Sequence, residues 1–346
     1  MRNHQHIITY SFTRFNRCYH IILNALVYRE TKWYLRSTAY AAIFPCQPRR
    51  FPMIRDYVYT FSKDNTPAAT AKPGDSLRFA TQDCFSGRIQ TPADLTKNFD
   101  YSKANPATGP VFIEGAEPGD ILRVRIDDIR VGDQGVVTTL PDVGPLADRM
   151  ETRTKVLALK NGKTVFNDME LTLNPMIGVI GTAPDGDPVA CGFPGDHGGN
   201  LDCKLITKGG RVLLPVRVPG ALLQLGDLHA LMGDAELCGT GLETPGEVDV
   251  TVDLIKNRPI PLPMLETAGH WHVFSADLDY TTALVNASRA MQDLLVAAYG
   301  WDRTDAYFYL SLEGDLGVNQ GCQPCPVPMV LRLSVPKRPD KPLLPV

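Results

Sequence analysis

Alternation of hydrophobic and polar residues recurs along most of the chain and predicts many short β-strands. The run 121–129 alternates leucine, valine and isoleucine with arginine and aspartate, and the run 248–255 alternates valine with polar residues. Because successive side chains of a strand point to opposite faces, both runs are typical of half-buried strands. Turn signals such as Asn161-Gly162 lie between the runs, so we expect sheets built from closely spaced strands.

One stretch shows the different spacing of an amphipathic helix. Within 281–299, apolar residues recur at intervals of three and four positions, and Gly300 follows as a plausible stop. A second, shorter helix is expected before Gly314. These patterns together predict a mostly β (α+β) fold, with sandwich-like β sheets and a smaller helix-containing part.

The length of 346 residues favours two domains. We place an N-terminal β-rich domain at 53–190 and a C-terminal β-rich domain, which carries the long helix, at 191–346. Residues 1–52 differ from both, because they hold eight Lys or Arg and a single acid, Glu30. We expect this basic extension to lie outside the fold and Met53 to be the true start.

Composition narrows the class of protein. Hydrophobic residues make up 44% and charged residues 21%, which is ordinary for a globular protein. A net charge of −3 argues against general nucleic-acid binding, and no apolar run is long enough to span a bilayer. The eight cysteines are scattered through the chain, which favours reduced thiols and a cytoplasmic location.

Candidate chemistry concentrates between residues 191 and 243. His197 and His229 lie in glycine-rich segments together with acids that include Asp202 and Glu236. Imidazole and carboxylate groups are ligands of zinc and related divalent metals, and an open position on such a metal activates water. The alternative is structural, since single acids and histidines in such loops usually cap turns.

Further candidates lie outside this segment. Asp83 follows a predicted strand, and Glu114 lies near a predicted hairpin turn, where a buried glutamate could act as a general base. A turn residue and an exposed charge are the structural alternatives for these two. His270 and His272 share one face of a predicted strand, and their spacing is compatible with a metal. Cys322 and Cys325 have the spacing of a redox motif but follow no βαβ pattern.

Several longer motifs carry a family resemblance. The runs 195–202, 214–221 and 226–240 resemble the acetamidase/formamidase family, and the upstream runs 81–87 and 109–120 fit the same family in the same order. The resemblance covers roughly residues 54 to 335.

The resemblance implies hydrolysis of a short aliphatic amide, such as formamide or acetamide, to a carboxylate and ammonia. We expect a divalent metal, zinc in particular, in a homo-oligomeric enzyme. The predicted metal ligands are His197, Asp202 and Glu236, with Asp83 and His229 completing the set. Glu114 is the predicted general base, with Glu236 as its rival for that role.

Two other functions stay open from the sequence. A non-catalytic β-sandwich could bind a metal or a sugar on the same scaffold and release no ammonia from amides. A redox protein could instead use Cys322 and Cys325, and its activity would be indifferent to chelators.

Overall fold

The computed structural model describes residues 10–15, 18–23, 25–29, 32–36 and 52–344. Its contacts group the chain into two units, residues 1–50 and residues 51–346. In the first unit, two antiparallel hairpins are formed by β1 (Tyr10–Phe15) with β2 (Cys18–Leu23) and by β3 (Ala25–Arg29) with β4 (Lys32–Arg36). The basic extension 1–52 corresponds closely to this unit, and much of it lies outside the described residues. A start at Met53 stays a prediction.

The second unit contains two large sheets of nine strands each. The first carries the helices on one face and is called the helix-covered sheet. Its strands, in spatial order, are β25 (Asp315–Gln320), β26 (Met329–Pro336), β24 (His270–Asp277), β23 (Met264–Glu266), β19 (Arg211–Pro215), β11 (Ile121–Val131), β22 (Gly246–Ile255), β9 (Ser76–Thr81) and β5 (Met53–Ile54).

The second sheet is called the buried sheet, because every residue of two of its strands, β16 (Met176–Gly181) and β20 (Leu223–His229), is buried. Its path runs through β13 (Thr154–Ala158), β12 (Gln134–Thr138), β21 (Glu243–Thr244), β20, β10 (Ala107–Ile113) and β6 (Tyr57–Val58). Beside this path lie β16, β18 (Gly198–Asn200) and β8 (Ala69–Ala71).

Smaller elements complete the second unit. They are the pairs β14 (Lys163–Phe166) with β15 (Met169–Thr172) and β7 (Thr60–Phe61) with β17 (Val189–Ala190), and three 3-10 turns, η1 (Thr96–Asn98), η2 (Tyr101–Lys103) and η3 (Ala147–Arg149).

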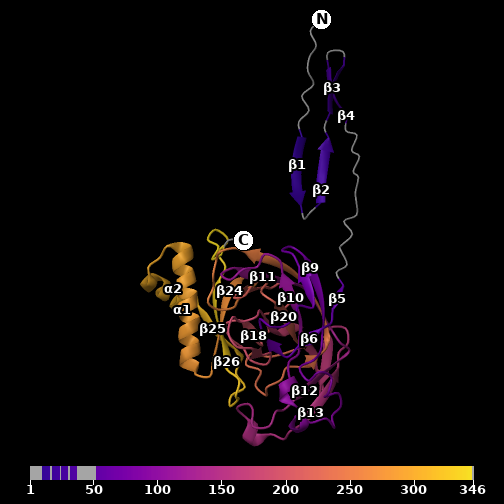
Figure 1. Cartoon of the computed structure of the whole chain (residues 1–346), viewed down its shortest axis with the longest axis vertical. Coiled ribbons are helices and arrows are strands. Elements are labelled where there is room, and N and C mark those ends of the chain that lie inside the picture. Colours follow the sequence, from indigo (N-terminus) through magenta and orange to yellow (C-terminus); the bar gives the residue numbers. More distant parts are fainter. Residues whose placement is uncertain (1–9, 16–17, 24, 30–31, 37–51, 345–346) are drawn as a thin grey trace. The chain divides into compact units, whose positions relative to one another are not determined.

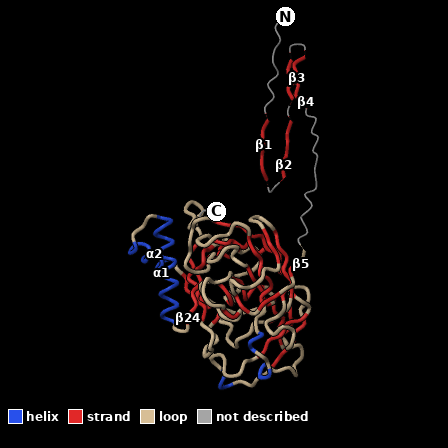
Figure 2. The backbone as a smooth tube through the Cα atoms, viewed as in Figure 1, coloured by secondary structure: helices blue, strands red, loops and turns tan. Residues whose placement is uncertain are grey.

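The two large sheets enclose the main hydrophobic core. Val248, Val250 and Val252 of β22 point inward, as their alternation predicted, and are fully buried. The same core contains Leu223 and Leu225 of the buried sheet. Burying apolar side chains of both sheets in one layer is what holds a sandwich together. The predicted mostly β class is thereby confirmed (Figure 2).

Two helices cover the opposite face of the helix-covered sheet (Figure 1). α1 (Tyr280–Tyr299) begins after Asp279, whose carboxylate accepts a hydrogen bond from the Thr282 amide, and it ends at Gly300 with φ of 68°. It agrees with the predicted helix 281–299. α2 (Arg303–Glu313) follows. α1 packs on β24 and β26, and α2 packs on β26 and on α1, through a second core.

The observed packing does not follow the expected division at residue 190. Residues 51–346 form one unit, because strands from before and after this position alternate within each sheet. β11, for example, lies between β19 and β22, both of which come from the second half. Within the described ranges, no helix combines the length and apolar character that crossing a membrane requires.

Candidate active site

A cluster of acids around one histidine forms at the end of β20. Asp227 and His229 are two positions apart on this strand, so their side chains lie on the same face. In the antiparallel pairing with β21, Glu243 lies directly opposite His229. As a result, His229 Nε2 is 3.3 Å from Glu243 Oε2 and 3.4 Å from Asp227 Oδ1.

Two further carboxylates reach this cluster from loops. Asp202 follows β18, and its Oδ1 lies 3.8 Å from His229 Nε2. Glu236 comes from the loop between β20 and β21, and together Asp202, His229 and Glu236 place one ligand atom each within 4.8 Å of one another. Gln320 of β25 donates a hydrogen bond of 2.6 Å to Asp202 Oδ2, which ties the cluster to the helix-covered sheet.

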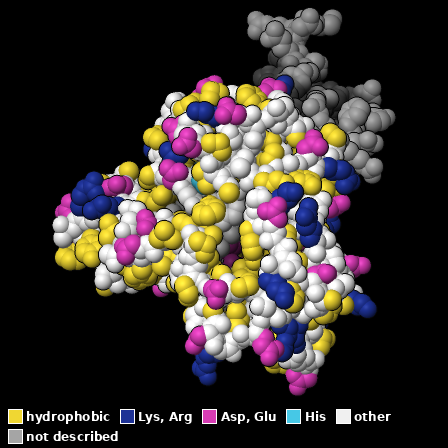
Figure 3. All heavy atoms as spheres, turned by 60° about the horizontal axis from the view of Figure 1, so that its bottom comes forward, with side chains coloured by type: hydrophobic (Ala, Val, Ile, Leu, Met, Phe, Trp, Pro, Cys, Tyr) yellow, Lys and Arg dark blue, Asp and Glu magenta, His cyan; other side chains and the backbone are white. Residues whose placement is uncertain are grey.

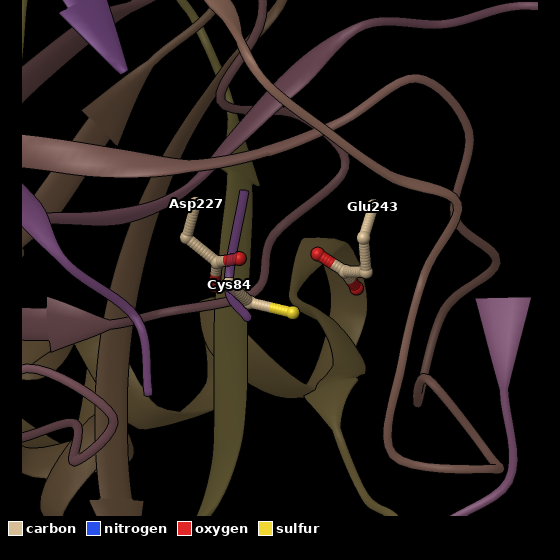
Figure 4. Close-up of side chains that lie close together, drawn as sticks. All are labelled: Cys84, Asp227 and Glu243. Carbon is tan, nitrogen blue, oxygen red and sulfur yellow. The ribbon is translucent and has the colours of Figure 1, made fainter. Parts of the chain in front are cut away.

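Cys84 forms a second, adjoining group with Asp227 and Glu243. Its sulfur and one carboxylate oxygen from each acid also lie within 4.8 Å, and the three side chains converge (Figure 4). The remaining oxygens are held in place, because Asn105 Nδ2 donates to Asp227 Oδ2 at 2.6 Å and the Gly241 amide donates to Glu243 Oε1 at 2.7 Å. These bonds leave the free oxygens directed at the cluster.

The backbone at this cluster is strained. Asp202, Asp227 and Glu236 have φ values of 38°, 55° and 46°, in the left-handed region that residues with a Cβ seldom adopt. Such strain costs on the order of 1–3 kcal/mol per residue and persists where the surroundings enforce it, frequently at functional sites. Three of the four carboxylates in the cluster therefore have an unfavourable backbone conformation, which interactions elsewhere in the fold must offset.

Burial controls the charge of the cluster. It raises the pKa of Asp202 and Glu243 well above their ordinary values and that of Glu236 to about 7. Burial opposes the charge of His229, yet Glu243 and Asp227 raise its pKa well above the usual value. One imidazolium cannot neutralise four buried carboxylates, so the cluster requires bound protons or a further positive charge.

The donor set fits a divalent cation. Among the residues that the structure describes, Asp202 Oδ1, Asp227 Oδ1 and Glu243 Oε2 are fully buried and have no hydrogen-bond partner. Unsatisfied buried oxygens are costly, and here they converge with an imidazole nitrogen and a thiol. Carboxylate, imidazole and thiolate are the ligands that zinc takes in proteins.

The cluster opens into a cavity of about 700 Å³. Asp227, Glu236 and Glu243 line it, together with Cys84 and Asn200. Much of the remaining wall is aromatic or aliphatic and includes Tyr59, Phe85, Tyr101, Leu140, Phe193 and Val327. Figure 3 shows a hollow bordered largely by hydrophobic side chains. An apolar chamber with a few converging polar groups is the usual form of a small-molecule site.

The structure brings together three of the predicted ligands and separates two. Asp202, His229 and Glu236 meet in the cluster. Asp83 instead caps its own turn, since its Oδ1 accepts from the amides of Phe85 and Gly87 at 2.9 Å each. His197 is buried against the Phe61 ring, and burial lowers its pKa to about 4. Neither Asp83 nor His197 belongs to the two ligand groups found in the described chain.

The structure places Glu114, the predicted general base, on the surface beside Lys72. Its side chain is 50% exposed, and its Oε2 lies 3.7 Å from Lys72 Nζ. It is not among the described residues that line the cavity. Glu114 is thus an exposed charge near a turn, which was the structural alternative for this residue.

His272 is likewise a buried structural residue. It is buried in the helix-covered sheet, where its two ring nitrogens lie 2.7 Å from Ser334 Oγ and 3.2 Å from Thr267 Oγ1. His270 beside it is exposed.

Three residues of the cluster were not among the predicted site residues. Asp227 had a usable signal, because it lies two positions before His229 in a strand and so shares its face. Cys84 directly follows the predicted Asp83, but sequence alone gives no reason to prefer the thiol. Glu243 is opposite His229 only through the strand pairing, which no local pattern encodes.

Comparison with known proteins identifies relatives of this fold and site. The model of the Acetamidase/Formamidase family matches residues 58–190 and 189–320. The formamidase of Methylophilus methylotrophus is 28% identical over 305 residues, which cover 63% of this chain and 75% of that protein.

Solved structures agree with the family match. The crystal structure of an acetamidase from Bacillus halodurans has a TM-score of 0.79 and 40% identity, covering 82% of this chain and 97% of that one. A recombinant predicted acetamidase/formamidase from Thermoanaerobacter tengcongensis has a TM-score of 0.79 and 39% identity, covering 82% and 95%.

The shared fold and the family match define an enzyme that hydrolyses linear amides. The chain belongs to the acetamidase/formamidase family, as its motifs predicted.

Proposed function

We propose that this enzyme hydrolyses short aliphatic amides, formamide or acetamide among them, with a divalent cation, zinc in particular, held at the buried cluster. The observation that carries this proposal is the convergence of four carboxylates on one imidazole at the wall of a 700 Å³ cavity, with three buried oxygens that lack partners in the described chain. The named relatives, a formamidase and an acetamidase, support the substrate class.

The ligands for the cation come from the two adjoining groups. Asp202, His229 and Glu236 form one, and Asp227, Glu243 and Cys84 offer further donors beside it. When bound, such a cation supplies Lewis-acid polarisation of a carbonyl and lowers the pKa of water.

The cavity-lining acids supply the proton transfers. Glu236 and Glu243 both reach the cavity, whereas Glu114 does not. Of the two bases predicted from the sequence, Glu236 therefore keeps the role. In that role, its carboxylate takes a proton from the attacking water and delivers it to the amide nitrogen, so that ammonia can leave. Glu243 is positioned to share this work because it lines the same wall.

The apolar residues of the cavity wall can accommodate the acyl chain of an aliphatic amide. Asn105 and Asn200, which line the cavity, present amide groups that can hydrogen-bond a carboxamide. We therefore expect activity over several short chain lengths rather than on formamide alone. The proposal also includes a homo-oligomeric state and a cytoplasmic location, which light scattering and cell fractionation test.

The test measures ammonia release from a series of C1–C4 amides by the purified chain, together with its metal content. We expect release from at least one amide, loss of activity after chelation, and recovery on adding zinc. His229→Ala should lose both metal and turnover, while Glu114→Gln serves as the matched control and should retain both. Turnover that survives complete removal of metal would refute the proposed requirement for a cation. A metal-loaded chain inactive on every amide would instead favour a non-catalytic binding protein.

A further inference from the structure

A pair of thiols lies in the wall of the same cavity. Cys322 and Cys325 both line it, in the turn that follows β25 and precedes β26. Cys322 is 3% exposed, and Cys325 is partly exposed. The Cys325 amide donates to Gln323 Oε1 at 2.9 Å, and Gln323 Nε2 donates to the Val327 carbonyl at 3.0 Å. The turn is thus a structured element that holds two thiols three positions apart.

The two thiols differ in reactivity. The neighbouring Cys322 thiol lowers the pKa of the Cys325 thiol, while Cys325 and burial raise the pKa of Cys322. The thiolate is the nucleophile in thiol chemistry, so Cys325 is the attacking thiol and Cys322 the resolving one. Cys325 is also the more exposed of the two, which gives an oxidant in the cavity access to it.

The thiol turn is connected directly to the acid cluster. Gln320, two positions before Cys322, donates to Asp202 Oδ2 at 2.6 Å. The Gly321 amide donates to the Ala235 carbonyl at 2.8 Å, and Ala235 immediately precedes Glu236. A shift of the turn is therefore transmitted to Asp202 through one side chain and to Glu236 through one backbone bond.

We propose that Cys322 and Cys325 are a modification site, at which a hydroperoxide or a low-molecular-weight disulfide forms a Cys322–Cys325 disulfide that lowers amide turnover. With hydrogen peroxide, the Cys325 thiolate attacks one oxygen and becomes a sulfenic acid, and water leaves. The Cys322 thiol then attacks that sulfur, the S–S bond forms, and a second water leaves. With a small disulfide, a mixed disulfide forms first and two free thiols are released.

The effect on turnover follows from geometry and rests on the proposed amidase function. Formation of the disulfide bond itself does not depend on that function. A covalent S–S bond draws the two sulfurs closer than two thiols in contact can lie, so the turn must tighten. Displacing catalytic groups by about 1 Å can reduce turnover about 100-fold. We expect a fall of about ten-fold or more on oxidation.

The experiment treats the full chain, loaded with zinc, with hydrogen peroxide or oxidised glutathione, and then with dithiothreitol. Peptide mass spectrometry should show a link between Cys322 and Cys325, and ammonia release from acetamide should fall and then recover. Cys325→Ser and Cys322→Ser, each compared with its own reduced activity, should resist the oxidant. Cys238→Ser, at a thiol that is also partly exposed but outside the lining described for the cavity, should behave like the unmodified chain.

The outcomes separate the two proposals. If no Cys322–Cys325 link forms, or if the link forms and turnover is unchanged, the inference is overturned. Equal inactivation of Cys325→Ser would place the damage at another thiol, such as Cys84, and would overturn it as well. If the reduced chain hydrolyses no amide, the proposed function fails, while the mass of the linked peptide still reports on the thiol pair.

Discussion

Gly178 shows how closely single positions are adapted to the buried acids. A Cβ at this position on β16 would lie 2.7 Å from Asp202 Oδ1 and 2.8 Å from Asp227 Oδ2. Both distances are far below ordinary contact, so the missing side chain is what allows the two carboxylates to approach. Asn105 donates a hydrogen bond to this same Asp227 Oδ2, and Gln320 and the Gly241 amide donate to oxygens of Asp202 and Glu243, so the carboxylates have little freedom to move away.

Gly178→Ala should therefore lower metal content and turnover together. We expect a loss of about 10-fold or more in metal affinity, because second-layer changes at metal sites typically cost 10- to 100-fold. Titration of the metal-free chain with zinc, followed by ammonia release, measures both. Gly186→Ala is the control, since a Cβ there meets open space. Equal zinc affinity in the two variants would contradict the role given to Gly178.

For single residues, the sequence predicted the type of chemistry better than it predicted the role of each residue. The glycine-rich segment with His229, Asp202 and Glu236 pointed to a metal-type cluster, and these three residues do meet. Asp83 lies outside the cluster, because a strand-end aspartate can turn back on its own backbone, and this one does. Nothing in the local pattern distinguishes the two conformations.

The helix-covered sheet is held by strand β24, which pairs with β26 along its whole length. His272 lies opposite Ser334 in this pairing and is 4% exposed. Burial lowers its pKa to about 4. The folded chain therefore keeps this imidazole neutral in a pH range where the unfolded chain protonates it.

The contribution of His272 to stability should fall as the pH drops from about 6.5 toward 4. In that window the unfolded state binds a proton at His272 that the folded state excludes, which favours unfolding by up to about 3 kcal/mol at the lower end. His272→Gln should flatten this part of the curve, as measured by urea unfolding at a series of pH values. His270→Gln is the control at an exposed neighbour and should change the slope less than His272→Gln does, because burial is the main cause of the lowered His272 pKa. An identical slope in both variants would show that His272 contributes nothing.

Individual helices and strands were easier to predict from the sequence than the pairing between strands. The helix 281–299 and the alternating strands at 121–129 and 248–255 follow from periodicity, and the structure has all three. The pairing of β20 with β16 and β21 does not follow, because β20 is buried throughout and shows no alternation from which a register could be derived. Cluster geometry depends on that register.

On the scale of the whole molecule, the two sheets are coupled by an ion pair. Arg332 of β26 donates from both terminal nitrogens to Asp234 at 2.8 Å each, and one of them also donates to Asn319. Asp234 lies two positions before Glu236 in the loop that leaves the buried sheet. The bidentate contact between the Arg332 guanidinium and the Asp234 carboxylate holds this loop against the helix-covered sheet.

Arg332→Lys should keep the charge and lose the two-pronged contact. We expect the free energy of unfolding to fall by about 1–2 kcal/mol and turnover to fall with it, because the loop that carries Glu236 loosens. Chemical denaturation and ammonia release measure the two effects. Arg338→Lys is the control, since its partner Glu313 lies on an exposed surface. A loss of turnover in Arg338→Lys equal to that in Arg332→Lys would contradict this account.

The division at residue 190 could not be corrected from the sequence, because strand order within a sheet is a property of long-range packing.

The alternation of early and late strands has a consequence for how the chain is made. Arg123 of β11 bonds to Asp253 of β22, 130 positions further along. At a synthesis rate of about 10 residues per second, β11 leaves the ribosome roughly 10 s before that partner exists. During this interval the edge of β11 that pairs with β22 has no partner strand, so the nascent chain carries an unpaired strand edge until β22 has emerged.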